Sequence, residues 1–314
     1  MNPRVLVFGS INMDLVAKVP RLPVPGETLL GHSFTTVPGG KGANQAVAVA
    51  RLEVPTAIVG RVGNQFGQEL LQNLQSDRVQ TSGIYTDLSN TSGVAIIAVD
   101  DNAENHIIVI PGVNGNIGEE DIERLMQQLP TASILLLQLE IPLSTVQKAA
   151  QAAQQAGVKV ILDPAPAPTE LPSELYPLVD IITPNAVEAG QLVDFTVNSP
   201  ESAEKAALVL QQRGVNTAII KLGAKGVFCA TLEEKFFTPA FSVKAVDTVA
   251  AGDAFNGGLA AALSQGYSLR EAVTWGAATG ALSATKAGAQ SSLPTRETVE
   301  TFLQQQKSLN NSYP

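Results

Sequence analysis

Short apolar runs alternate along this chain with longer stretches of helical periodicity, and this alternation constrains the fold more than any other feature. The apolar runs lie at residues 5–9, 57–60, 133–139, 158–162, 179–182 and 218–222. The helical stretches between them lie at 42–52, 67–76, 119–129, 144–156 and 201–213. Continuous apolar runs are typical of strands buried on both faces, and the intervening helices supply crossovers between parallel strands. The pattern predicts one α/β domain over 1–314, a doubly wound, mostly parallel sheet with helices on both faces.

Two segments, at about 15–38 and 91–113, interrupt the alternation because they are strand-like and contain no helix of their own. The second includes a hairpin pattern, with strands at 93–99 and 105–110. Two such pieces in an otherwise α/β chain predict a small additional β-sheet inserted in the domain. We expect it to form a lid over the crevice at the carboxyl ends of the strands, where open α/β sheets bind ligands.

Charge and composition exclude several classes of function. A net charge of −9 and a pI of about 4.8 argue against nucleic acid or an anionic membrane as partner. The single cysteine, Cys229, excludes internal disulfides and cysteine-rich metal sites, and its apolar neighbours predict a buried side chain. The sequence shows neither a signal-peptide pattern nor an apolar run long enough to span a bilayer, so we expect a cytoplasmic protein.

The segment from Asp247 to Asp253 combines small residues with an acid at the start of an apolar helical run. Small side chains let a ligand approach the backbone, and the N–H groups of a first helical turn favour an anion. A carboxylate at that place repels a phosphate, but it can accept a proton from a nucleophile that attacks the phosphate. The segment alone fits equally well an ordinary helix start in which Asp253 only complements the helix dipole.

A second cluster, Gly39-Gly40-Lys41-Gly42-Ala43-Asn44, is a glycine-rich turn that leads into a helix but does not match a Walker A loop. Its amide and cation suit a neutral ligand rich in hydroxyl groups, while the alternative is a tight turn capped by Asn44. Asn12 and Asp14 follow the first strand and would face the same way if it continued. A carboxylate can accept hydrogen bonds from two vicinal hydroxyls, so this pair suits a sugar, although an Asx turn explains it equally well.

Three further features follow apolar strands. Glu140 ends the apolar run 133–139, where a carboxylate needs a ligand hydroxyl or a cation such as Lys41 nearby. Asn185 and Glu188 are three apart on one helix face, a spacing that suits hydrated magnesium or phosphate oxygens. The glycine-containing turn at 221–226 is a weak signal, because many hairpins contain such turns.

In this order, these residues resemble the ribokinase-like carbohydrate kinase family over essentially the whole chain. The resemblance implies an α/β core with a β-sheet lid that often serves as the interface of a homodimer. It also implies transfer of the γ-phosphate of ATP to a sugar hydroxyl, with Mg²⁺ and commonly with activation by K⁺. The expected acceptor is ribose, and 2-deoxyribose, fructose or a nucleoside remains an alternative. A nucleoside would need an apolar or aromatic platform, and only 5% of the residues are aromatic.

The resemblance also assigns roles to individual residues. Asp253 would be the base that removes the proton of the ribose 5-hydroxyl, and the backbone amides of Ala250, Ala251 and Gly252 would form the anion hole. The positions that match sugar-binding residues are Asn12, Asp14, Gly40, Lys41, Asn44 and Glu140. Those that match nucleotide-binding positions are Asn185, Lys221, Gly223, Gly226, Gly252 and Ala277. Glu188 would organise Mg²⁺ through water, and the K⁺ site would comprise Asp247, Val249, Ser283, Lys286, Gly288 and Ser292, several of them through backbone carbonyls.

The chain departs from the family pattern at three positions. Ala277 stands where members often place a polar side chain near the nucleotide, and Lys221 stands where threonine is frequent. These two departures concern which nucleoside triphosphate the protein prefers as phosphate donor. Asn64 replaces an acid that usually follows Val62-Gly63, which concerns a loop cap. A non-catalytic sugar sensor would have lost Asp253 or the small residues before it, and a dinucleotide-dependent oxidoreductase would need a Gly-x-Gly-x-x-Gly pattern after the first strand.

Overall fold

The computed structural model describes residues 4–102, 104–168 and 170–310. In this part of the chain a nine-stranded sheet has the order β13-β12-β11-β10-β9-β8-β1-β4-β5. The seven neighbouring strands β11-β10-β9-β8-β1-β4-β5 all pair in parallel, and β12 is antiparallel to both of its neighbours. The bounds are β1 Arg4–Phe8, β4 Thr56–Gly63, β5 Gln80–Asp87, β8 Ala132–Leu137, β9 Lys159–Leu162, β10 Ile181–Ile182, β11 Thr217–Lys221, β12 Gly226–Ala230 and β13 Lys235–Pro239. The predicted mostly parallel sheet is confirmed.

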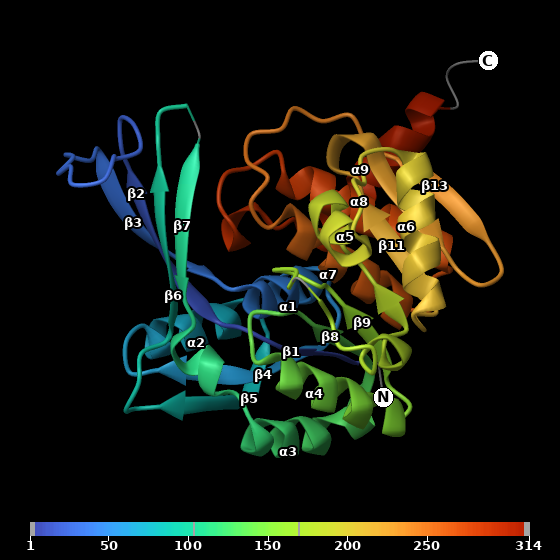
Figure 1. Ribbon diagram of the computed structural model, residues 1–314, viewed down its shortest axis with the longest axis horizontal. Helices are drawn as coiled ribbons and strands as arrows, with labels where there is room; N and C mark the ends of the chain where they lie inside the picture. Colours follow the sequence, from blue (N-terminus) through green and yellow to red (C-terminus); the bar gives the residue numbers. More distant parts are fainter. Residues whose placement is uncertain (1–3, 103, 169, 311–314) are drawn as a thin grey trace.

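Helices cover both faces of this sheet (Figure 1). They are α1 Lys41–Arg51, α2 Gly67–Ser76, α3 Glu119–Gln128, α4 Leu143–Gln155, α5 Ala186–Val193, α6 Pro200–Gln212, α7 Ala251–Ser264, α8 Leu269–Ser283 and α9 Arg296–Asn310. Short 3₁₀ turns lie at η1 Gly112–Asn116, η2 Leu129–Thr131, η3 Tyr176–Leu178, η4 Gly223–Lys225 and η5 Gln290–Ser292. None of the helices in the described ranges has the length and hydropathy needed to cross a membrane.

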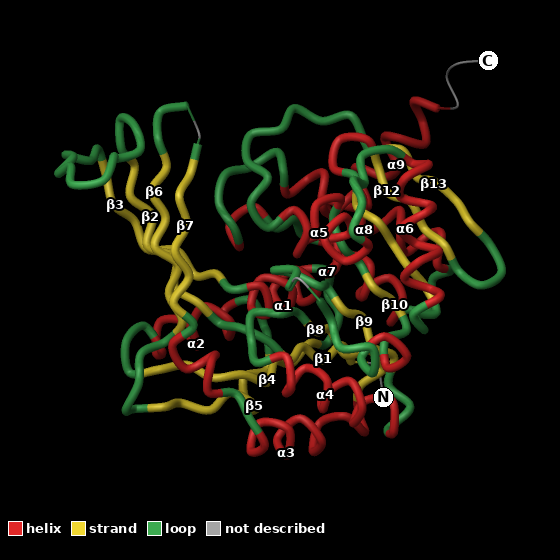
Figure 2. Tube along the Cα trace, in the orientation of Figure 1, coloured by secondary structure: helices red, strands yellow, loops and turns green. Residues whose placement is uncertain are grey.

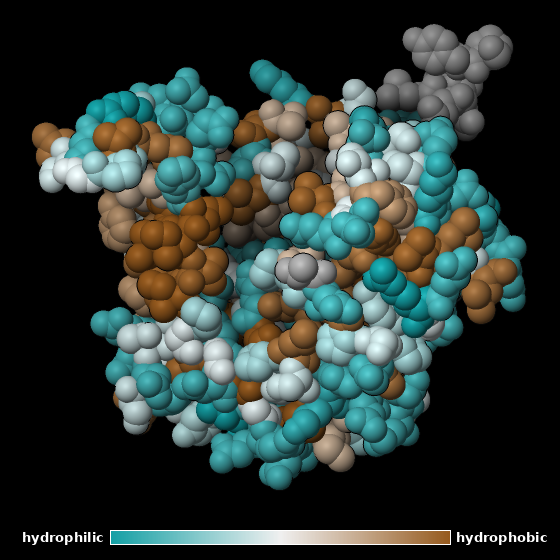
Figure 3. Space-filling model, viewed as in Figure 1, coloured by the Kyte–Doolittle hydropathy of each residue, from teal (hydrophilic) through white to brown (hydrophobic). Residues whose placement is uncertain are grey.

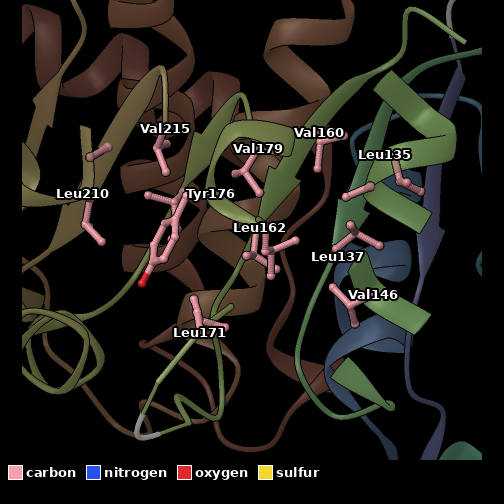
Figure 4. Packing of buried hydrophobic residues seen from close by; sticks show 14 of the residues in the cluster. Leu135, Leu137, Val146, Val160, Leu162, Leu171, Tyr176, Val179, Leu210 and Val215 are labelled. Carbon is pink, nitrogen blue, oxygen red and sulfur yellow. The ribbon is translucent and has the colours of Figure 1, made fainter. Parts of the chain in front are cut away.

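The two faces of the sheet bury separate hydrophobic clusters. Leu6 and Phe8 of β1 pack in one cluster with residues of α3 to α6, whereas Val5 and Val7 pack in the other with residues of α1, α2 and α7 to α9. This division follows from the alternation of side chains along a strand. Figure 4 shows the first cluster, in which side chains of neighbouring strands, such as Leu135 of β8 and Val160 of β9, lie side by side. The continuous apolar pattern of the strands therefore reflects burial on both faces.

A second, four-stranded sheet stands away from the large one, and Figure 2 shows its strands rising beside the helices. Its order is β3-β2-β6-β7, with β2 parallel to β6 and the other pairs antiparallel. The strands are β2 Asn12–Lys18, β3 Ser33–Gly39, β6 Gly93–Val99 and β7 Asn105–Ile110. The predicted hairpin of β6 and β7 is confirmed at the same bounds. The strand β2 starts at Asn12, earlier than expected, because Asn12 pairs with both Gly39 and Gly93.

Candidate active site

The carboxyl ends of the central strands and the starts of two helices meet at one place. Ser10 follows β1, Glu140 follows β8 and Asp163 follows β9, while Lys41 begins α1 and Asp253 lies in the first turn of α7. Hydrogen bonds join these segments across more than 100 residues of sequence, for example from the Ser10 hydroxyl to Glu140 at 2.5 Å. The site lies in the crevice where open α/β sheets commonly bind ligands.

Asp253 is buried, with 4% of its surface exposed, and both of its carboxylate oxygens accept hydrogen bonds. The Asn44 amide donates to Oδ2 at 2.9 Å, and the Gln45 amide donates to Oδ1 at 3.1 Å. Burial raises the pKa of Asp253 to about 6, the charge of Asp163 adds to this effect, and Lys41 and the two amides oppose it. At neutral pH the group is a carboxylate that readily accepts a proton, which is what a general base requires.

The start of α7 has an unusual backbone conformation. Its N-cap, Ala250, has a left-handed backbone with φ of 58°, an unfavourable conformation for a residue with a Cβ, and its side chain provides no cap hydrogen bond. The Ala251 N–H donates to the Thr248 carbonyl at 3.2 Å, so this amide is already engaged. Gly252 and Asp253 occupy the next positions of the first turn, where N–H groups have no intrahelical acceptor. The Ala251 N–H is therefore engaged within the turn, whereas those of Gly252 and Asp253 lack an acceptor within the helix.

Lys41 lies among carboxylates at the start of α1. Burial disfavours its charged form, but the surrounding carboxylates hold the pKa of the ammonium above its ordinary value. They belong, in order of decreasing effect, to Asp253, Asp163, Glu140 and Glu188. The backbone N–H of Lys41 also donates to Glu140 at 3.1 Å. The expectation that Glu140 has a cation nearby therefore agrees with the structure, which adds a backbone donor.

Asn12 and Asp14 lie on β2, and neighbouring residues fix each of them. The Asn114 amide donates to the Asn12 side-chain oxygen at 2.7 Å and also bonds to the backbone of Ile11. Burial, followed by the charges of Glu140 and Asp253, raises the pKa of Asp14 to about 7. A Cβ at Gly39 would overlap the Asp14 carboxylate, so only glycine leaves room for this side chain.

Gly40 needs its lack of a side chain for a different reason. Its φ is 87°, and a Cβ there would lie 2.7 Å from the backbone nitrogen of Asn12. The glycines at this turn allow the start of α1 to approach the end of β1 closely, with the Gly42 N–H 3.3 Å from the Ser10 hydroxyl. The turn thus places Lys41 and Asn44 beside Asp253.

Residues expected near a nucleotide gather around the ends of β10 and β11. Asn185 and Glu188 form a capping box at the start of α5, with bonds of 2.7 and 2.9 Å. The backbone of Asn185 also forms an isolated parallel β-bridge with that of Lys221. The Lys221 ammonium donates to Asp163 at 3.0 Å. Burial and the charge of Asp163 raise the pKa of Glu188, although Lys221 opposes this. The helix cap accounts structurally for one oxygen of Glu188 and leaves the other for a ligand.

Other expected nucleotide positions have a structural explanation or a more distant place. Gly223 and Gly226 lie in the turn between β11 and β12 with φ of 58° and 124°, so the turn geometry itself requires them. Ala277 lies on α8, partly buried against the second hydrophobic cluster. Gly252 faces Lys221, because a Cβ on Gly252 would lie 3.4 Å from the ammonium nitrogen. The lysine is therefore placed directly at the start of α7.

The residues expected to bind a monovalent cation come together in two loops beside the start of α7. The Asp247 carboxylate accepts hydrogen bonds from the Val249 and Gly288 N–H groups at 3.0 and 2.9 Å. The hydroxyls of Ser283 and Ser292, both fully buried, lie 2.7 Å apart. The N–H of Lys286 donates to the Ser283 carbonyl, so this residue closes the turn that follows α8. Carboxylate, hydroxyl and carbonyl oxygens are donors that suit a hard cation.

Several buried polar residues of this site were not predicted from the sequence. Gln45 donates both to Asp253 and, at 3.0 Å, to Asp163, and its own oxygen accepts from Gln138 at 2.7 Å. Asn114 was missed as well, although it holds Asn12 in place. The signal that could have identified Asp163 and Gln138 is a polar residue at the end of a continuous apolar strand, where burial is costly without a partner.

The chain is similar to known carbohydrate kinases. A model described as pfkB family carbohydrate kinase matches residues 2–296. A ribokinase of Haemophilus influenzae is 43% identical over 305 residues, covering 97% of this chain and 99% of the relative. A deoxyribokinase of Salmonella typhi is 36% identical over 300 residues, covering 95% and 98%. A structure of Arabidopsis thaliana ribokinase complexed with ribose and ATP has a TM-score of 0.89 at 32% identity, covering 96% and 99%.

Proposed function

Because this chain belongs to the pfkB family of carbohydrate kinases, we propose that it transfers the γ-phosphoryl group of ATP to the 5-hydroxyl of D-ribose. The observation that carries the proposal is the buried carboxylate of Asp253, fixed by two amides at the start of α7. The relative named ribokinase and the structural neighbour that binds ribose and ATP support this choice of substrates.

In the proposed reaction Asp253 takes the proton of the 5-hydroxyl as that oxygen attacks the γ-phosphorus. The bond between the γ-phosphorus and the bridging oxygen of ADP breaks, and ADP leaves. The N–H groups at the start of α7 and the ammonium groups of Lys41 and Lys221 would offset the negative charge of the transferred group. The protein contributes mainly position and charge, because phosphoryl transfer needs little covalent help.

The sugar would lie between β2 and the start of α1. Asp14 and Glu140 supply carboxylate acceptors, and Asn12, Asn44 and Lys41 supply amide and ammonium groups. Within the described ranges, the buried side-chain oxygen of Asn44 has no hydrogen-bond partner. A buried polar atom without a partner is costly, so a sugar hydroxyl that donates to it would stabilise the complex. Gly40 contributes by keeping the backbone close.

The nucleotide would lie over the ends of β10 and β11, near Asn185, Lys221 and Gly252, with the adenine toward Ala277 and the turn from Gly223 to Gly226. Among residues 4–102, 104–168 and 170–310, no group of three or more His, Cys, Asp or Glu side chains could hold a metal ion. A magnesium ion would therefore be bound by phosphate oxygens of the nucleotide and would reach Glu188 through water. When bound, the ion would neutralise phosphate charge.

The loops that carry Asp247, Val249, Ser283, Lys286, Gly288 and Ser292 would bind a potassium ion, because they supply a carboxylate, two buried hydroxyl oxygens and backbone carbonyls. The bound ion would supply a fixed positive charge behind the start of α7. Asp247 already connects the two loops through its bonds to Val249 and Gly288. The residues themselves thus hold the segment that leads to Ala250 in place.

The experiment that tests the function measures ADP release by the purified protein with ribose, 2-deoxyribose, fructose or adenosine as acceptor, in potassium and again in sodium. We expect the highest kcat/KM with ribose and higher activity in potassium. A preference for 2-deoxyribose is the second candidate, because a deoxyribokinase is among the relatives. Ribose binding without ADP release would contradict the catalytic role of the site.

The pH dependence of ribose phosphorylation should show two acid groups. The pKa of Asp14 is about 7 and that of Asp253 about 6, and both groups act as carboxylates. Acidification below pH 7 protonates Asp14 first and Asp253 next, so kcat/KM should fall about 10-fold per pH unit below 7 and more steeply below 6. The profile of kcat should show only the lower step. A kcat/KM constant from pH 5.5 to 8 would contradict these roles.

The four-stranded sheet, built from the segments at about 15–38 and 91–113, would act as the lid of the single domain and as the interface of a homodimer. The edge strand β7 exposes Ile107, Ile108, Val109 and Ile110, and Figure 3 shows the hydrophobic patch over β6 and β7. An unpaired apolar edge is a surface to which a second copy can bind. We place the reaction in the cytoplasm, where ATP is available, with no nucleic acid or membrane as partner.

A glutamate in place of Ile108 should convert the dimer to a monomer in sedimentation experiments. The side chain of Ile108 is 62% exposed, so its replacement should leave the fold intact, while a charge in an apolar interface is costly. Met126→Glu is the matched control, since Met126 is 54% exposed on α3, away from the second sheet. A dimer that survives Ile108→Glu would place the interface elsewhere.

A further inference from the structure

A buried ion pair lies beside the proposed base. The Lys221 ammonium donates to Asp163 Oδ1 at 3.0 Å, and the two side chains are only 12% and 3% exposed. Lys221 ends β11 and Asp163 follows β9, so the pair connects two strands at their carboxyl ends. The ammonium also lies next to Gly252, at the place where the anion-binding turn of α7 begins.

The other oxygen of Asp163 is connected to the base. Gln45 Nε2 donates to Asp163 Oδ2 at 3.0 Å and to Asp253 Oδ1 at 3.1 Å, so one amide nitrogen uses its two hydrogens on the two carboxylates. Gln138 holds the Gln45 oxygen at 2.7 Å, which fixes the orientation of the amide. Asp163 is thus the only carboxylate in the described chain shown to bond to both Lys221 and Gln45.

An ammonium group has three donors, and Asp163 engages one of those of Lys221. The remaining donors are close to the turn where the transferred phosphate would bind. Holding a cation in place before the substrate arrives avoids the cost of reorganising it during the reaction. The charge of Lys221 also lowers the pKa of Glu188, so the ammonium acts on a second acid of the site as well.

We propose that Asp163 is a positioning residue for phosphoryl transfer, which holds the Lys221 ammonium at the start of α7 and, through Gln45, the carboxylate of Asp253. The proposal rests on the proposed function, since it concerns the same reaction. It gives Lys221 a specific task, as a cation for the transferred phosphoryl group. It also explains why a buried acid follows β9 in a site that already contains several carboxylates.

The first test is Asp163→Asn, which keeps the shape of the side chain. Asparagine can accept from Lys221 or from Gln45 but not from both, because one oxygen becomes an amide donor. We expect kcat to fall about 10- to 100-fold and the KM for ATP to rise, with little change in the KM for ribose. Asp180→Asn is the matched control, because Asp180 accepts the Val160 N–H at 2.8 Å just before β10, at the amino-terminal ends of the strands, away from the site. A normal kcat in Asp163→Asn would overturn the proposal.

The second test separates positioning from structural support. Lys221→Met leaves Asp163 buried without its cation and should lower the melting temperature. The double variant Asp163→Asn with Lys221→Met contains a neutral pair and should recover the melting temperature. We expect its kcat to stay as low as that of Lys221→Met. Recovery of kcat along with stability would show that the pair only supports the fold, and would overturn the proposal.

The pH profile provides a third measurement, because it reports the electrostatic contact between Asp163 and the base separately from the stability of the fold. Charged groups near Asp253 are Lys41 on α1, Asp14 on β2 and Asp163 after β9, and Asp163 raises its pKa. Asp163→Asn removes that negative charge, so the acid limb of kcat should move to lower pH. A profile that is only scaled down would count against the proposal. Failure of the wild-type protein to phosphorylate any sugar would instead contradict the proposed function.

Discussion

Asp253→Asn is expected to lower kcat for ribose by about 10²- to 10⁴-fold while leaving the affinity for ribose nearly unchanged. The asparagine has the size of the aspartate but cannot take the proton of the attacking hydroxyl. The surrounding bonds can be kept, because Asn44 can turn its amide and present its unpartnered oxygen to the new NH₂ group. The Asn44 NH₂ group then faces the sugar, and a sugar hydroxyl can accept from it instead of donating to the oxygen. Gln45 can still donate to the remaining oxygen. Measurement of kcat and of ribose binding by calorimetry checks both parts.

The same substitution should increase stability at neutral pH. The pKa of Asp253 is raised from its ordinary value of 3.8 to about 6 in the folded protein. A raised folded-state pKa means that the stability contribution of this group is present below pH 4 and is lost as the pH rises through 6. At 1.36 kcal/mol for each pKa unit, the ionised group reduces the free energy of unfolding at pH 7.5 by about 3 kcal/mol. Asparagine removes this cost.

Thermal unfolding at two pH values tests this trade-off within one pair of proteins. We expect the variant to melt above the wild type at pH 7.5, and the difference to vanish near pH 4, where Asp253 of the wild type is protonated. A variant with normal kcat would exclude Asp253 as the base. A variant that is inactive but also less stable at pH 7.5 would show that the hydrogen bonds to the carboxylate outweigh its burial.

Asp14→Ala is expected to raise the KM for ribose by about 10²- to 10³-fold with a smaller change in kcat. A hydrogen bond to a charged group contributes about 1.5–3 kcal/mol, and a carboxylate that accepts from two vicinal hydroxyls makes two such bonds. Asp14→Asn retains one acceptor and should give an intermediate KM. Because Gly39 already leaves space for the aspartate, a smaller residue at position 14 introduces no steric strain. Steady-state kinetics on both variants checks the order.

The acceptor provides a matched control for Asp14. The compound 2-deoxyribose lacks one hydroxyl of the pair, so Asp14→Ala should weaken its binding less than that of ribose. The wild-type preference for ribose over 2-deoxyribose should therefore become much smaller in the variant. An equal loss for both sugars would mean that Asp14 does not bind the 2-hydroxyl.

The parts of the site that the sequence predicted are those encoded locally. The acid after the small residues at 250–252 and the glycines before Lys41 indicate anion and sugar chemistry because helix starts and tight turns are determined by near neighbours. The alternation of apolar and amphipathic runs likewise predicted the parallel sheet, because both faces of each strand had to be covered. The hairpin at 93–99 and 105–110 followed from two strand-like runs on either side of the turn residues 100–102.

The residues that were missed act through partners far away in the sequence. Gln45 meets Asp163 and Asp253 across 118 and 208 residues, and Asn114 meets Asn12 across 102. No local pattern marks a glutamine in the middle of a helix as the link between two acids, since only the packing of α1 against α7 places it there. The engaged amide of Ala251 and the capping role of Glu188 are further details of geometry that residue types alone do not determine.

The strand β2 belongs both to the proposed sugar site and to the sheet that carries the proposed dimer interface. Asn12 lies abreast of Gly39 and Gly93 on a single rung of the four-stranded sheet, and the same strand continues outward to Lys18. The paired residues Asn12, Gly39 and Gly93 therefore lie beside the proposed sugar site and also at the base of the sheet that carries the proposed dimer surface. Binding free energies are reciprocal, so any gain in sugar affinity on pairing of two copies must equal the gain in pairing on sugar binding. Dilution of the enzyme and depletion of its sugar would then act on the same equilibrium.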